Sequence, residues 1–206
     1  KTISHETKAP PRYTEASLVQ RLEKEGVGRP STYASIISTI IDRNYARKLG
    51  TSIVPTFTGV AVAQLLNKNF PDLLDYSFTS EMENSLDEIA EGNKNWIAYL
   101  KSFYLGAKGL KSSVDKKEKD IEPETSRTII LPHIKNFSVK VGRFGPYVVA
   151  NEGSKKAEEV HASIPENIAP ADITELDVSE LIDRSQKGPT PIGQDPKTGE
   201  NIYCLV

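Results

Sequence analysis

Apolar residues in the first half of the chain recur every three to four positions, the spacing of helices that bury one face. This pattern predicts helices over residues 14–25, 30–40, 60–70, 79–91 and 94–105. Between the second and third helices, residues 44–49 and 51–56 predict two short strands of a hairpin around Gly50. Two helices joined by a turn and followed by a hairpin predict a winged-helix-like arrangement, whose second helix often meets nucleic acid.

Local signals mark the ends of these helices. Thr14 is a suitable N-cap, and Gly26 ends the first helix where a left-handed residue is wanted. Pro30 is expected in the first turn of the second helix, because its missing N–H would be unpaired there anyway. The last of the five helices places large apolar side chains at helical spacing, so we expect them in the core: Trp96, Leu100, Phe103 and Tyr104.

The pattern changes after residue 110. Residues 111–127 are highly charged and predict a linker. Beyond them, alternating apolar positions predict strands over 128–131 and 136–141, and a glycine-flanked turn leads into a third strand within 142–149. A short helix is expected over residues 171–184.

The end of the chain repeats an earlier segment. Residues 201–206 share the asparagine start and the apolar positions of residues 136–141, which predicts one repeat followed by the first strand of a second. We expect the natural chain to continue with another Gly-Arg-aromatic-Gly segment. The fold class is therefore α+β: a helical domain over 1–110, the linker over 111–127, and a small β-rich repeat domain over 128–206 whose second repeat is truncated.

Composition narrows the class of protein. The chain has 206 residues, 37% hydrophobic and 26% charged, which is typical of a soluble protein. No apolar run approaches the roughly 20 residues that span a bilayer, and no signal peptide opens the chain, so we expect a cytoplasmic protein without membrane contact. Lys1 in place of Met indicates a segment of a longer protein. A single cysteine excludes an internal disulfide, and the histidines are too scattered to predict a metal site.

Charge is distributed in blocks along the chain. The net charge is −2, yet residues 1–50 carry 9 Lys and Arg against 5 Asp and Glu, and residues 101–150 carry 10 against 5. The other two blocks are acidic. Because attraction to phosphate depends on local patches, the small net charge does not exclude nucleic-acid binding.

The turn over residues 26–32 is the first candidate site. Arg29 stands just outside a helix start whose opening residues are polar, namely Ser31, Thr32, Tyr33 and Ser35. Free backbone N–H groups, hydroxyls and a cation can together bind a phosphate. The alternative is ordinary capping, with the Arg29 side chain in solvent.

The second candidate site is the segment GRFGPY over residues 142–147. It clusters a cation with two aromatic rings, which grip single-stranded nucleic acid by charge and stacking: Arg143, Phe144 and Tyr147. The alternative is a packed β-hairpin in which the two rings fill a small core.

Several motifs together resemble bacterial type IA DNA topoisomerase I. They read PPRYTEASLV at 10–19, GVGRPSTYASII at 26–37, Asp42-Arg43, FTSEME at 78–83 and Leu86-Asp87. The resemblance covers about residues 8–105. Residues 128–206 resemble the C-terminal repeats of many of these enzymes, which are built around Gly-Arg-aromatic-Gly-Pro-Tyr-Val.

The resemblance implies a function. The family relaxes negatively supercoiled DNA: it cuts one strand through a phosphotyrosine, passes the other strand, and reseals the break using Mg²⁺. It implies that Arg29 meets a backbone phosphate, that Thr32 supplies a strand-contacting hydroxyl and that Arg43 is another strand-binding position. The expected partner is DNA, preferentially single-stranded, in a nucleoid-associated bacterial protein.

The resemblance also implies what this chain lacks. None of its eight tyrosines precedes an Arg-Thr-Asp-Ser-like motif, which marks the family's nucleophile, and the acidic cluster that holds Mg²⁺ is absent. The acidic residues of 81–91 are expected to form a solvated helix face. We therefore expect no catalytic residue, no bound cofactor and no DNA cleavage by this chain alone.

Two other classes of function stay open. The chain could be a winged-helix regulator that binds duplex DNA through the second helix and the hairpin. It could also be a protein-interaction module whose repeats dock RNA polymerase or other proteins. Strand preference separates the regulator from a topoisomerase segment, since the latter should favour single strands.

Overall fold

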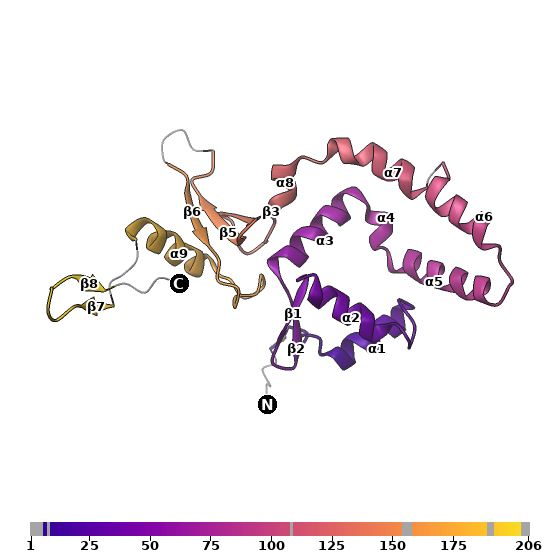
Figure 1. The fold of residues 1–206 in the computed structure, drawn as a ribbon, viewed down its shortest axis with the longest axis horizontal. Helices are drawn as coiled ribbons and strands as arrows, with labels where there is room; N and C mark the ends of the chain where they lie inside the picture. The colour runs from indigo at the N-terminus through magenta and orange to yellow at the C-terminus, as the bar shows by residue number, and fades with distance from the viewer. Residues whose placement is uncertain (1–5, 8, 108, 154–157, 189–191, 203–206) are drawn as a thin grey trace, which may run out of the picture. The chain divides into compact units, whose positions relative to one another are not determined.

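The computed structural model describes the chain except for residues 1–5, 8, 108, 154–157, 189–191 and 203–206 (Figure 1). Its contacts divide the chain into two compact units. The first unit combines Lys1–Thr56 with Phe70–Ser113, and the second combines Phe57–Asn69 with Val114–Val206. The domain limits expected at residues 110 and 127 stay a prediction, but by its contacts the helix over 57–69 belongs with the later part of the chain.

Helices and small antiparallel sheets make up the described residues, which confirms the α+β class. The helices are α1 (Glu15–Glu25), α2 (Tyr33–Asp42), α3 (Phe57–Asn69), α4 (Pro71–Leu74), α5 (Tyr76–Ala90), α6 (Trp96–Leu100), the π-helical η1 (Lys101–Leu105), α7 (Leu110–Lys117), the 3₁₀-helical η2 (Glu118–Asp120), α8 (Pro123–Arg127) and α9 (Glu175–Lys187). The strands are β1 (Ala46–Leu49), β2 (Ser52–Pro55), β3 (Thr128–Ile129), β4 (Ser138–Gly142), β5 (Gly145–Ala150), β6 (Val160–Ser163), β7 (Gly193–Gln194) and β8 (Asn201–Ile202).

Helix α1 is bounded as its sequence predicts. Thr14 and Ser17 cap each other's backbone N–H groups, and Gly26 ends the helix with a left-handed φ of 69°. A side chain at position 26 would also collide with the hydroxyl of Ser80 on α5. Gly26 is therefore required both by the turn and by the close approach of α5.

The first unit has a small core and the predicted hairpin. Strands β1 and β2 pair antiparallel from Ala46 opposite Pro55 to Leu49 opposite Ser52, which confirms the turn at Gly50. One side chain from α2 and one from each strand are buried together, with Leu18, Val19, Ile40 and Ile41 packed against them: Ile37, Ala46 and Ile53. The predicted order of helix, turn, helix and hairpin is therefore observed.

Several helix starts differ from the prediction, among them that of α3, which begins at Phe57 instead of residue 60. Helix α2 begins at Tyr33, and Pro30 lies in the preceding turn instead of in the first helical turn. Helix α5 begins at Tyr76 instead of residue 79, because Asp75 accepts a hydrogen bond from the Ser77 N–H and caps it. Pro71, expected only to end the third helix, also opens the four-residue α4.

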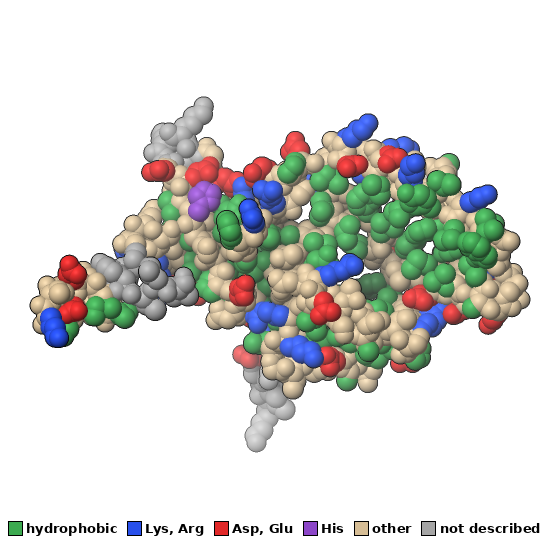
Figure 2. All heavy atoms as spheres, in the orientation of Figure 1, with side chains coloured by type: hydrophobic (Ala, Val, Ile, Leu, Met, Phe, Trp, Pro, Cys, Tyr) green, Lys and Arg blue, Asp and Glu red, His purple; other side chains and the backbone are tan. Residues whose placement is uncertain are grey.

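The aromatic residues expected in the core after residue 94 are largely exposed. Trp96 keeps 57% of its surface accessible and Tyr104 keeps 50%. Only part of the group packs as predicted: Phe103 stacks on Phe78 and Tyr99, each with ring centroids 6.3 Å apart. Figure 2 shows hydrophobic side chains gathered over α5 and α6 on the face in view.

The segment predicted as a linker is mostly helical. Helix α7, η2 and α8 cover most of residues 110–127. Charged residues are good helix formers when they are Lys and Glu, and Pro123 at the start of α8 is compatible with a first turn. The boundary between the two units falls inside this segment, between Ser113 and Val114, so its role as a linker stays a prediction.

The second unit is built on a four-stranded antiparallel sheet in the order β3-β4-β5-β6. Strands β4 and β5 form the predicted hairpin, with Gly142 opposite Gly145 at its turn. The sequence did not predict β6, and it placed the start of α9 four residues too early, because Thr174 caps that helix through Asp177. Helix α9 packs against β5 and β6.

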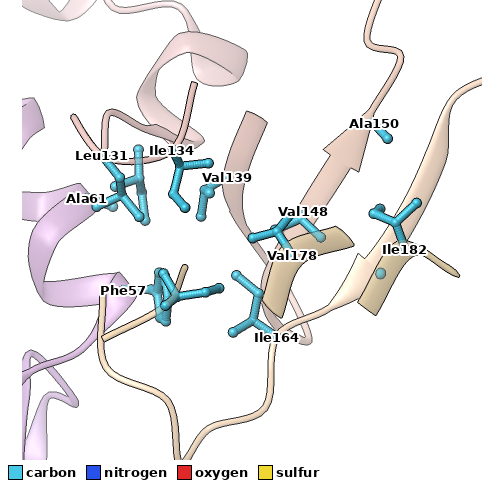
Figure 3. Close-up of a cluster of buried hydrophobic side chains, with 13 residues drawn as sticks. Phe57, Ala61, Leu131, Ile134, Val139, Val148, Ala150, Ile164, Val178 and Ile182 are labelled. Carbon is cyan, nitrogen blue, oxygen red and sulfur yellow. The ribbon is translucent and has the colours of Figure 1, made fainter. Parts of the chain in front are cut away.

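Helix α3 completes the core of this unit. Phe57 is 3% exposed and lies with Ala61 in the same buried cluster as the sheet residues Val139 and Val148 and the α9 residue Val178 (Figure 3). The core of the sheet therefore depends on a helix that precedes it by more than fifty residues.

One side chain of α3 also pairs with the edge of the sheet. Gln64 Nε2 donates to the Ile130 carbonyl at 2.8 Å, and the Ile130 N–H donates to Gln64 Oε1 at 2.9 Å. Ile130 directly follows the edge strand β3. Gln64 therefore fixes α3 to the sheet through two backbone groups.

The segment predicted to begin a second repeat is described only in part. Strands β7 and β8 pair antiparallel, with Gln194 opposite Asn201. The strand predicted over 201–206 begins as expected at Asn201, but residues 203–206 lie outside the described ones. None of the helices in the described part of the chain combines the length and apolar character needed to cross a bilayer.

Candidate nucleic-acid interface

The turn between α1 and α2 holds the backbone of Arg29 in place. The Arg29 N–H donates to Thr32 Oγ1 at 2.8 Å, and the Thr32 hydroxyl donates to the Arg29 carbonyl at 3.1 Å. The Thr32 N–H bonds the same carbonyl at 2.8 Å and closes a tight turn around Pro30. Thr32 therefore fixes the point from which the Arg29 side chain leaves the backbone.

The Arg29 guanidinium is bound to helix α5. Its Nε and Nη2 both donate to Asp87 Oδ2, at 3.0 and 2.8 Å, and Nη2 also donates to Asn84 Oδ1 at 3.0 Å. Its Nη1 donates to the Gly28 carbonyl at 2.9 Å. The hydrogen bond to Asp87 is the main cause that raises the pKa of Arg29. Neither sequence-based alternative included this ion pair.

The remaining polar residues of the motif lie around the start of α2. Ser31 and Ser35 are exposed, whereas Thr32 and Tyr33 are half-buried. Ser35 Oγ donates to the Thr32 carbonyl at 2.8 Å. No side chain caps the first turn of α2, so the ordinary capping expected as the alternative is not observed. An uncapped helix start beside two exposed hydroxyls can accept an anion.

Arg43 lies at the opposite end of α2 from Arg29. It is the C-cap residue of that ten-residue helix, and its side chain is exposed. Its backbone N–H donates to the Thr39 carbonyl at 3.0 Å, but its side chain makes no hydrogen bond or ion pair with any residue that the structure describes. The structure therefore does not bring Arg43 together with Arg29 and Thr32, and Arg43 is available to a ligand.

In the second unit, the turn between β4 and β5 presents an aromatic ring to solvent. Phe144 is 99% exposed, and the Arg143 guanidinium carbon lies 5.8 Å from the centre of its ring. The packed hairpin considered as an alternative required Phe144 to fill a core, which this exposure contradicts. A cation beside an exposed ring is suited to stacking on a base while meeting its phosphate.

Tyr147 contributes a second ring, beside a residue that the sequence did not single out. The Tyr147 and His161 ring centroids are 5.8 Å apart with planes tilted by 33°. Together with Arg143 and Phe144 these rings line a cavity of about 210 Å³. His161 could have been found from the alternation over 160–164, where Val160 is half-buried, Ala162 is buried and His161 is exposed.

The structure shows no candidate metal site in the part of the chain that it describes. No group of three or more His, Cys, Asp or Glu side chains there could hold an ion. The acidic face of α5 instead makes separate contacts: Asp87 pairs with Arg29, and Glu88 pairs with Lys94 at 3.1 Å. The acidic side chains that the structure describes therefore do not fit a bound Mg²⁺.

Comparison with known proteins gives the same relatives along the whole chain. Residues 1–101 match the family model described as DNA topoisomerase, and residues 135–190 match the model described as topoisomerase C-terminal repeat. A DNA topoisomerase 1 of Synechocystis sp. is 48% identical over 205 residues, which are 100% of this chain and 22% of the relative. A DNA topoisomerase 1 of Mycobacterium tuberculosis is 40% identical over 97% of this chain and 23% of its own length.

A solved structure agrees with these sequence relatives. Full-length topoisomerase I from Thermotoga maritima matches with a TM-score of 0.61 and 32% sequence identity, over 79% of this chain and 26% of that one. The chain therefore spans about a quarter or less of the length of the relatives that it matches.

Proposed function

We propose that this chain, which belongs to the bacterial type IA DNA topoisomerase family, binds single-stranded DNA for a parent enzyme that relaxes negatively supercoiled DNA. In that enzyme one strand is cut through a phosphotyrosine, the other strand passes through the gap, and the break is resealed with Mg²⁺. The nucleophilic tyrosine and the Mg²⁺ ligands are assigned to parts of the parent outside this chain. The chain itself therefore binds DNA without cutting it, in a protein that acts at the nucleoid.

The exposed turn at Arg143 and Phe144 carries this proposal. A phenylalanine that is 99% exposed has only the Arg143 guanidinium beside it and buries almost none of its ring, so the ring is free to stack. Stacking tolerates any base, because every base has a π face, and this suits an enzyme that meets many sequences. Tyr147 and His161 extend the same surface with a cavity beside the turn.

The first unit offers phosphate contacts in place of stacking. Arg29 is oriented by Thr32 and lies beside an uncapped helix start, and Arg43 is unpaired among the described residues at the other end of α2. Charge-assisted bonds from arginine position a strand without reading its sequence. We assign Ser31 and Ser35 as additional hydroxyl contacts, with Tyr33 beside them.

Fluorescence anisotropy with labelled single-stranded and duplex oligonucleotides tests the proposal, at low and moderate salt. We expect salt-sensitive binding that favours the single strand and weakens in Phe144→Ala and in Arg29→Ala. Leu176→Ala is a matched control, because Leu176 is 69% exposed in the second unit but lies on α9, outside the turn. Preference for one duplex sequence would contradict the proposal and favour a regulator, and binding to neither would favour repeats that dock RNA polymerase or other proteins.

A further inference from the structure

The Arg29 guanidinium has little hydrogen-bonding capacity left in the structure. Of its five N–H donors, one on Nε, two on Nη2 and one on Nη1 are used by Asp87, Asn84 and Gly28. One N–H on Nη1 is unused. A phosphate that is to accept two parallel bonds from this side chain must therefore replace an acceptor that is already present.

Asp87 accepts from the same edge of the guanidinium that a phosphate would use. Nε and Nη2 lie side by side, and both point at Oδ2 of the carboxylate. Asp87 is reachable from solvent, since its side chain is 55% exposed and that of Arg29 is 29% exposed. Another anion can thus approach the pair without any rearrangement of the core.

Resting on the function proposed above, we propose that Asp87, supported by Asn84, takes the place of a DNA phosphate in the free protein. Arg29 must leave Asp87 when it binds the strand. Strand binding in the first unit then exchanges one anion for another on a preformed arginine. The ion pair keeps Arg29 oriented in the free protein and also limits its affinity for the strand. Release of the strand is favoured for the same reason, because Asp87 recaptures the guanidinium.

The exchange has a measurable electrostatic consequence. A neutral Arg29–Asp87 pair attracts few counterions or phosphates, whereas an unpaired Arg29 attracts one phosphate. Removing the Asp87 charge should therefore tighten binding about threefold or more at low salt. Because Arg29 contacts one phosphate in the complexes of both proteins, the slope of log Kobs against log salt concentration should change by less than about 0.7, the increment for one extra phosphate contact on a single strand.

The test is a double-mutant cycle on the 206-residue chain, with the single-stranded oligonucleotide as ligand. The variants are Asp87→Asn, Arg29→Ala and the double variant, each checked for an unchanged circular dichroism spectrum and melting temperature. If Asp87 competes for Arg29, then Arg29→Ala costs at least threefold more affinity in the Asp87→Asn background than in the wild-type background. Glu81→Gln is the matched control: it removes the same charge from an exposed site on α5 that has no contact with Arg29 among the described residues.

Each result decides a separate question. Equal costs of Arg29→Ala in both backgrounds, or weaker binding by Asp87→Asn, would overturn the exchange and leave the proposed function standing. An equal effect of Glu81→Gln and Asp87→Asn would also overturn it, since only the overall charge of α5 would then matter. If the wild-type chain does not bind single strands at all, the proposed function fails and the exchange fails with it.

Discussion

Lys140, on the inner strand β4, and Glu152, two residues after β5, form a close ion pair with Nζ 2.6 Å from Oε1. The Lys140 side chain is only 12% exposed, and Glu124 lies 3.4 Å away on its other side. The hydrogen bond from Lys140 is the main cause that lowers the pKa of Glu152 below its usual 4.5. The same pair raises the pKa of Lys140 above its usual 10.5.

These directions predict how the stability of the second unit depends on pH. A carboxylate whose pKa is lowered by folding stabilises the protein above its unfolded pKa, and this contribution is lost as pH falls through the folded value. We therefore expect the free energy of unfolding to decline below about pH 4.5 and Glu152→Gln to reduce this decline. For Lys140 the dependence on pH is reversed, because folding raises the pKa of this group. Its contribution to the free energy of unfolding is present at lower pH and is lost only as the pH rises above about 10.5.

Urea unfolding at several pH values measures this dependence. Glu166→Gln is the control, because Glu166 is exposed and makes no hydrogen bond or ion pair with a described residue. A decline of the same steepness in Glu152→Gln and in wild type would show that the pair does not contribute.

Substitution by alanine should have opposite effects at Phe57 and at Phe144, lowering stability at the first and weakening DNA binding at the second. Phe57 is 3% exposed in the core of the second unit, so Phe57→Ala should lower the free energy of unfolding by about 3–5 kcal/mol. Phe144 is 99% exposed, so Phe144→Ala should leave stability nearly unchanged and weaken single-strand binding by about 1–3 kcal/mol if one base stacks there.

Denaturant unfolding and fluorescence anisotropy, each measured on both variants, compare their stability and their single-strand binding. Hydrogen exchange should place the loss in Phe57→Ala at the amides of β4 and β5, although residue 57 precedes them by some eighty positions. If Phe57→Ala left those amides as protected as in wild type, α3 would not be part of that core.

Alanine substitutions at Gly26 and Gly50 distinguish the cost of a strained backbone from the cost of a steric clash with a neighbouring side chain. Both have positive φ, 69° and 60°, but only Gly26 faces a neighbour, the Ser80 side chain, whereas the space beside Gly50 is open. Gly50→Ala should therefore cost only about 1–2 kcal/mol for the left-handed backbone. Gly26→Ala should cost more, because the Ser80 side chain must also shift. Equal shifts of the melting temperature would contradict the close approach of α1 and α5.

His161 gives a further prediction on the binding surface. Its ring lies beside Tyr147 and lines the cavity next to Phe144. We expect His161→Ala to weaken single-strand binding by roughly 1 kcal/mol, the lower end of the stacking range. His133→Ala, the same change at another exposed histidine of the second unit, should have no effect in the same anisotropy assay.

The sequence predicted the elements whose signals are local. Thr14 and Gly26 mark the two ends of α1 by capping chemistry, and Gly50 lies between two strand patterns. The limits of α1 and the turn of the hairpin were therefore predicted correctly. The start of α2 was wrong because Pro30 fits a β-turn as well as a first helical turn. The hydrogen bonds between Arg29 and Thr32 stabilise the β-turn instead of a first helical turn, and no sequence pattern shows these bonds.

The parts that the sequence missed depend on distant partners. Arg29 and Asp87 are 58 positions apart, and either one read alone resembles an ordinary surface charge. Phe57 was assigned to no element, because it lies between the strand predicted over 51–56 and the helix predicted over 60–70. Its burial depends on strands that begin about seventy residues later. The exposure of Trp96 also escaped prediction, because helical spacing shows which residues share a face and not whether anything covers it.

The pairing of Gln64 with Ile130 also affects how copies of this chain meet one another. An edge strand with free N–H and C=O groups is a template on which a strand of another molecule can add. Beside β3, the amide of Gln64 already occupies both groups of Ile130, although the Ile130 side chain is 73% exposed. One glutamine thus blocks the addition of a foreign strand at Ile130, and its loss is expected to appear first as self-association at high protein concentration.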